Sequence, residues 1–234
     1  MKTIVNEQLV KRRANLGKWA LFGGMGVLAL GFVLSLSRQG SVGWMLGCLV
    51  LGWLLSTIGS ANTMRWARRP RADEMIAQAI KGFDDRYRLY NYVLPAPHVL
   101  LSPAGLFVLT AMRHEGRIRY EDGKWRRDFS LWRTVRFMTE EGLGRPHSLA
   151  SAEAADLQKW LDQQEDPPEA EIHSVLVFVH PTVELDARDA PQPALLPKDL
   201  KRLLSTHRTT SPLGKKEYYQ FRRVFDSVTD GKAE

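Results

Sequence analysis

Cysteine is almost absent from this chain of 234 residues. The single cysteine, Cys48, lies inside a hydrophobic run, so the chain has no disulfide framework and no cysteine-based zinc site. We interpret Cys48 as a small packing residue. The shortage of cysteine fits a reducing compartment such as the cytosol.

Acidic residues are equally scarce at the start of the chain. Residues 1–71 contain one acid, Glu7, against ten lysines and arginines, a net charge of +9. The remaining residues, 72–234, hold 23 bases and 25 acids, a net charge of −2. The overall charge of +7 therefore belongs to the flanks of the hydrophobic segments, and the bulk charge of residues 72–234 predicts no phosphate binding.

Formal charge is missing altogether from two stretches, residues 19–37 and 39–64. A helix of 19 residues rises about 28 Å, close to the thickness of the hydrocarbon core of a bilayer. Arg38 alone separates the two stretches, and one continuous helix would place it at mid-membrane at a cost of about 2.5–3.5 kcal/mol. The sequence therefore predicts a transmembrane hairpin with helices over about 19–37 and 42–61 and a polar link at 37–41.

Basic residues on both sides of this hairpin predict its orientation. The positive-inside rule places both termini in the cytoplasm, and we expect an integral protein of a bacterial inner membrane. The bases after the second helix are expected to contact anionic lipid head groups: Arg65, Arg68, Arg69 and Arg71. Gly43 and Gly47 form a small-xxx-small pair that predicts a helix contact. A cleaved signal peptide, the alternative, would leave the second apolar stretch unexplained.

Composition and periodicity divide the chain into four parts. We assign a basic cytoplasmic N-terminus (1–18), the transmembrane hairpin (19–64), a basic juxtamembrane linker (65–71) and a cytoplasmic domain (72–234). In the last part, hydrophobic patterning predicts helices at 72–83, 151–164 and 198–205, and a final helix capped by Ser211. It predicts strands at 89–94, 98–102, 106–110, 116–120, 124–129 and 175–179. Residues 181–197 are predicted to form a loop. This order predicts an α/β fold with a mixed sheet flanked by helices.

One block of this domain resembles a known family. The run from His98 to Leu109 (HVLLSPAGLFVL), followed by Gly116-Arg117-Ile118 and Trp125, resembles the nuclease-related domain (NERD) family. The resemblance covers about residues 72–205 and implies a restriction-endonuclease-like fold. It also implies a hairpin on which two carboxylates hold a divalent cation at the scissile phosphate and a lysine assists the reaction.

At the catalytic positions the chain departs from the family. Pro97 stands where the family has aspartate, Thr110 where it has glutamate, Met112 where it has lysine, and Leu149 where it often has glutamine. The resemblance therefore implies a catalytically degenerate nuclease, a pseudoenzyme without a cofactor. In the alternative, Mg²⁺ would bind at relocated acids, for which the candidates are Glu74 and Glu115.

The remaining motifs leave three functions open. Aromatic and basic residues interleave at 125–129, which includes Arg126 and Arg127, and at 132–137, a pattern typical of phosphate contact but also of a solvated strand face. The six histidines lack metal-ligand spacing, and there is no nucleophile elbow or phosphate loop. A degenerate binding or scaffolding module, an active metal-dependent nuclease and a membrane-associated domain that binds only proteins all remain. The sequence indicates neither the partner, a nucleic acid or a protein, nor the oligomeric state.

Overall fold

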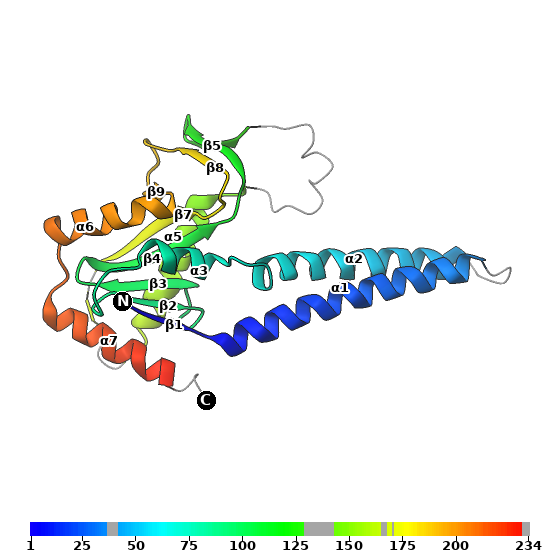
Figure 1. The fold of residues 1–234 in the computed structure, drawn as a ribbon, viewed down its shortest axis with the longest axis horizontal. Helices are drawn as coiled ribbons and strands as arrows, with labels where there is room; N and C mark the ends of the chain where they lie inside the picture. The colour runs from blue at the N-terminus through cyan, green and yellow to red at the C-terminus, as the bar shows by residue number, and fades with distance from the viewer. Residues whose placement is uncertain (37–41, 129–142, 165–167, 170, 231–234) are drawn as a thin grey trace. The chain divides into compact units, whose positions relative to one another are not determined.

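The computed structural model describes residues 1–36, 42–128, 143–164, 168–169 and 171–230. The chain divides into two compact units (Figure 1). The helix-pair unit contains Glu7–Arg71, and the sheet unit combines Met1–Asn6 with the described residues from Ala72 onward.

Two long helices make up the helix-pair unit, α1 (Glu7–Leu36) and α2 (Val42–Trp66). Both are long and apolar enough to cross a membrane, by length and composition. Most of the large exposed hydrophobic side chains of the described chain lie on them, among them Trp19 and Trp44, which are 77% and 75% exposed. The predicted polar link at 37–41 lies outside the described residues.

Glycines set the packing of α1 on α2. On α1, Gly17, Gly24 and Gly31 recur every seven residues and face α2, where Gly52 and Gly59 have the same spacing. A Cβ atom added at Gly24 would lie 2.6 Å from the backbone nitrogen of Ser56. The two backbones therefore approach too closely for a side chain between them.

The predicted contact at Gly43 and Gly47 is wrong. Both glycines are exposed, and no atom of the described chain lies within 4 Å of a Cβ added at Gly47. The spacing of four residues is common in membrane helices, whereas the contact face of these helices follows the seven-residue repeat.

A mixed six-stranded sheet forms the centre of the sheet unit, in the order β1-β2-β3-β4-β7-β9. Its strands are β1 (Lys2–Val5), β2 (Arg88–Asn91), β3 (His98–Ser102), β4 (Gly105–Met112), β7 (Ile172–Phe178) and β9 (Ala194–Leu195). β2, β3 and β4 are antiparallel, whereas β1 runs parallel to β2, and β4, β7 and β9 run parallel to one another. A smaller sheet has the order β6-β5-β8, with β5 (Gly116–Glu121), β6 (Lys124–Arg127) and β8 (Val183–Asp186).

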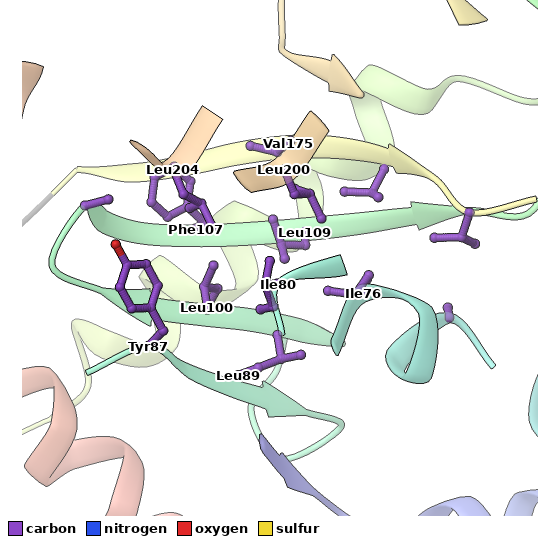
Figure 2. Packing of buried hydrophobic residues seen from close by; sticks show 14 residues of the cluster. Ile76, Ile80, Tyr87, Leu89, Leu100, Phe107, Leu109, Val175, Leu200 and Leu204 are labelled. Carbon is purple, nitrogen blue, oxygen red and sulfur yellow. The ribbon is translucent and has the colours of Figure 1, made fainter. Parts of the chain in front are cut away.

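Helices cover both faces of the larger sheet. One face packs on α3 (Ala72–Ala79) and α6 (Leu200–Thr210), which follows the 3₁₀ turn η1 (Pro197–Asp199). Figure 2 shows this cluster, which contains Ile76 and Leu204 from the helices and Leu100, Phe107 and Leu109 from the strands. The other face packs on α5 (Pro146–Leu161) and α7 (Lys215–Asp230). The predicted α/β fold with a mixed sheet flanked by helices is thus observed.

The structure corrects several predicted boundaries. Residues 1–18 are not one basic segment, because residues 2–5 form β1 and α1 begins at Glu7. The predicted loop at 181–197 contains β8 and β9, which have only four and two residues and so lack a readable period.

Helix ends also differ from the expected ones. α3 stops at Ala79, before Gly82 with φ +103°. α5 starts at Pro146 rather than Ser151. α7 starts at Lys215, because the backbone nitrogen of Leu213 donates to the carbonyl oxygen of Pro103 and holds the residues after Ser211 outside the helix.

Candidate functional site

The strand positions of the family motif share one face of the sheet. Successive side chains of a strand point to opposite faces. Leu106 and Val108 of β4 pack in the cluster that contains α5 and α7, so Thr110 and Met112 also point to that side. Pro97 stands immediately before β3, and its carbonyl oxygen accepts from the backbone nitrogen of Tyr92 at 2.8 Å. The fold therefore keeps the family's β3–β4 hairpin beneath α5.

Thr110 contacts an acid that the sequence analysis missed. Its side chain is 1% exposed, and its hydroxyl group donates to Oε2 of Glu153 on α5 at 2.5 Å. Glu153 lies one helical turn after Leu149, the position where the family often has glutamine. Residues four apart share a helix face, so this spacing was the available signal.

Met112 lies in an apolar environment. It is 5% exposed and packs in a cluster with Ile118, Ala150, Leu176, Phe178 and Val183. A lysine at this position would place an ammonium group among hydrocarbon side chains, which is costly without a paired charge. The structure therefore uses the family's lysine position for packing.

The two acids proposed from sequence do not meet Thr110. Glu74 belongs to α3, which packs on the opposite face of the sheet. Glu115 follows β4, and its carboxylate lies 4.0 Å from Nε2 of His180. The acid that accepts the hydrogen bond of Thr110 is Glu153.

The site residues do not fit a divalent cation. Mg²⁺ takes six oxygen ligands, usually one or two carboxylates with water and phosphate. Among the described residues at these positions, Glu153 supplies a carboxylate and Thr110 a hydroxyl group, and Met112 and Pro97 supply a thioether and a proline ring. Among the residues that the structure describes, no group of three or more histidine, cysteine, aspartate or glutamate side chains has a metal-binding arrangement.

His98, which matches the family's histidine, makes a buried polar contact. Its Nδ1 shares a hydrogen bond of 2.8 Å with Oδ1 of Asn91, and both residues are at most 3% exposed. The ring of Tyr92 meets the His98 imidazole edge-on, with 5.0 Å between the ring centroids. The contact joins the ends of β2 and β3 and indicates a packing role.

The proposed phosphate strip is largely engaged with its own strands. Arg126 forms an ion pair with Asp122 at 3.1 Å, and Nε of Arg127 donates to the carbonyl oxygen of Glu115 at 2.9 Å. The neighbouring Arg119 pairs with Asp128 at 2.7 Å. The second half of the strip, residues 132–137, lies outside the described residues.

The juxtamembrane arginines differ in their exposure. Arg65, Arg68 and Arg69 are exposed, and the guanidinium of Arg65 lies 5.7 Å from the centre of the Trp66 ring. Arg71 is 7% exposed and lies 3.7 Å from the carboxylate of Glu7, so it is not an open lipid contact.

Two imidazoles of the sheet unit lie side by side, and one of them, His173, has a lowered pKa. The rings of His173 on β7 and His207 on α6 lie 4.8 Å apart. Burial lowers the pKa of His173, nearby Glu171 opposes this change, and the adjacent His207 adds to it. The unfolded chain therefore binds a proton more readily at His173 than the folded chain does.

This shift predicts lower stability in acid. A histidine whose pKa is lower in the folded than in the unfolded chain stabilises the folded state fully only above the ordinary histidine pKa of about 6.5. Its contribution to the free energy of unfolding decreases as the pH falls below that value. In neutral detergent, the thermal midpoint of the sheet unit should be lower at pH 5.5 than at pH 7.5. H173Q should reduce this difference. An unchanged difference in H173Q would assign the effect to other groups.

The β3–β4 hairpin, the parallel strand β7 beside it and α5 across it are the parts expected of a nuclease-related α/β domain. Residues 69–179 match the family model of the nuclease-related domain, so this part of the chain is similar to that domain. The comparisons with curated proteins and with solved structures gave no match.

Proposed function

We propose that this chain is a membrane-anchored, catalytically degenerate nuclease-related domain that acts as a binding or scaffolding module at the cytoplasmic face of a bacterial inner membrane. The observation that carries the proposal is the site beside the β3–β4 hairpin. There Met112 is packed among apolar side chains and Thr110 is engaged by Glu153. The family match supports a nuclease-related module.

Chain connectivity supports the anchor. β1 precedes α1 and α3 follows α2, and both β1 and α3 belong to the sheet unit. If α1 and α2 cross the bilayer, they must therefore return to the side on which they began. With basic residues at both ends of the pair, that side is the cytoplasm. Arg65, Arg68 and Arg69 would then lie near the anionic head groups.

A second candidate is an active metal-dependent nuclease. The contact between Glu153 and Thr110 favours it, because a carboxylate stands on α5 beside the family's glutamate position. One carboxylate is a small part of the usual ligand set. The apolar cluster around Met112 provides no charged group to stabilise the transition state.

A cleavage assay separates the two candidates. The full-length chain in neutral detergent, with Mg²⁺ or Mn²⁺, should cleave neither single- nor double-stranded DNA or RNA. Losing both the second carboxylate and the lysine removes several kcal/mol of transition-state stabilisation, and each 1.36 kcal/mol is about tenfold in rate.

The controls are E153Q, E74A and E115A. Metal-dependent cleavage that disappears in E153Q would establish the second candidate with Glu153 as a ligand, and loss in E74A or E115A would assign the ligand to those acids. Cleavage that survives all three variants would indicate a contaminant. As a complement, P97D combined with T110E and M112K should bind Mn²⁺ if the hairpin retains the family geometry.

A further inference from the structure

The C-terminal helices carry a concentrated positive charge. Residues 198–223 contain eight lysines and arginines and two acids, a net charge of +6, whereas residues 72–197 have a net charge of −6. The near-neutral total of residues 72–234 conceals this separation. The charged segment also lies outside residues 69–179, which match the nuclease-related domain.

Four of these bases surround one tyrosine on α7. Lys215, Lys216, Arg222 and Arg223 stand three or four residues before or after Tyr219, so all five side chains share one helix face. All five are exposed, whereas Tyr218, Phe221 and Phe225 on the opposite face are buried against the sheet. The basic face of α7 is defined here as these five residues.

Tyr219 is an unusual surface residue. Its side chain is 59% exposed. Among the described residues of the sheet unit, Tyr219 and Leu149 are the only large hydrophobic residues that are exposed. Arg222 forms an ion pair with Asp226 at 3.5 Å. Within the described part of the chain, Lys215, Lys216 and Arg223 make no ion pair. The face thus combines an open aromatic ring with at least three free cations.

α7 begins far from the point at which the chain leaves the sheet unit. The chain leaves the sheet for α1 after Val5, which lies beside Asn91 and His98 at one end of β2 and β3. α7 begins near the other end of β3, where Leu213 bonds to Pro103. The first turn of α7 therefore lies at the end of the sheet remote from the exit to the helix pair.

We propose that the basic face of α7 binds single-stranded nucleic acid. The ring of Tyr219 would stack on an unpaired base, and the four bases around it would contact the adjoining phosphates. Duplex DNA hides the faces of its bases inside the stack, and a peptide of acidic residues alone offers no aromatic ring for Tyr219 to stack on. None of the five residues of this face is one of the family's catalytic positions Pro97, Thr110 and Met112, so its binding needs no metal and no cleavage.

Fluorescence anisotropy tests this proposal with the full-length chain in neutral detergent, in the presence of EDTA. The probe is a fluorescein-labelled oligothymidylate of 20 nucleotides. Four phosphate contacts predict a slope of log affinity against log salt of about −3. Y219A should weaken binding about tenfold, since it removes one base stack, whereas Y219F should preserve it.

Matched charge variants distinguish this face from general electrostatic attraction. The double variant K215Q/K216Q should weaken binding and halve the slope of log affinity against log salt. The double variant K198Q/K201Q removes the same charge from η1 and α6 and should change the affinity little. Equal loss in the two double variants, or tight binding by Y219A, would overturn the proposal. So would absence of binding at low salt, equal affinity for a duplex of the same length, or equal competition by polyglutamate.

Discussion

A chain in which Glu7–Arg71 is replaced by a flexible Gly/Ser linker should be a folded protein that is soluble without detergent. The replacement removes α1 and α2, which carry most of the exposed large hydrophobic side chains, and keeps β1 attached to the sheet unit. The full-length chain should remain in the membrane fraction after carbonate extraction. If the full-length chain is soluble without detergent, the anchoring proposal fails.

The linker is needed because β1 completes the sheet. Backbone hydrogen bonds join Lys2 to Tyr87 at 3.0 Å and Asn6 to Asn91 at 3.1 Å, on either side of the parallel pairing of β1 with β2. Without β1, the edge of β2 would expose unpaired N–H and C=O groups beside the fully buried Leu89 and Tyr90.

A chain that starts at Ala72 is the matched comparison. It should be less stable to urea than the linked chain and more prone to aggregate, although the two differ chiefly by residues 1–6. Urea titrations followed by tryptophan fluorescence measure the difference. Equal midpoints for the two chains would mean that β1 contributes nothing to the sheet unit.

The variant G59L should separate α1 from α2. A Cβ atom at Gly59 would overlap the backbone of Leu21, including its nitrogen and Cα, which cannot move aside as a flexible side chain does. Overpacking in a close contact costs about 1–3 kcal/mol, and here it acts on the backbone of the facing helix. The helix pair should therefore unfold at a markedly lower fraction of sodium dodecyl sulfate in mixed micelles.

G47L is the control on the same helix. It adds the same side chain where no described atom lies within 4 Å of the new Cβ, so its unfolding midpoint should stay close to that of the unchanged chain. Equal sensitivity of the two variants would contradict the glycine contact of α1 and α2.

Hydrophobic patterning alone determined much of the architecture. Residues 19–36 and 42–64 of the two uncharged stretches lie in α1 and α2. The strand predicted at 175–179 is most of β7, whose residues from Val175 onward are at most 1% exposed. The Ser102–Gly105 turn signal gave the β3–β4 hairpin, which carries the family motif. Each of these features depends on neighbouring residues or on hydrophobicity that is sustained over one long segment, so it can be recognised from that segment alone.

Only the tertiary structure decided which residues meet across long separations. β1 pairs with β2 over more than eighty residues, and its four residues carry no period strong enough to be recognised. Thr110 and Glu153 are joined by the packing of α5 on the sheet, and the spacing of Glu153 from Leu149 indicates only that these two residues share a helix face. Glu74 and Thr110 lie on opposite faces of the sheet, because α3 packs on one face and α5 on the other. The face on which a helix packs depends on how several elements bury their apolar faces together, so the sequence near Glu74 does not reveal it.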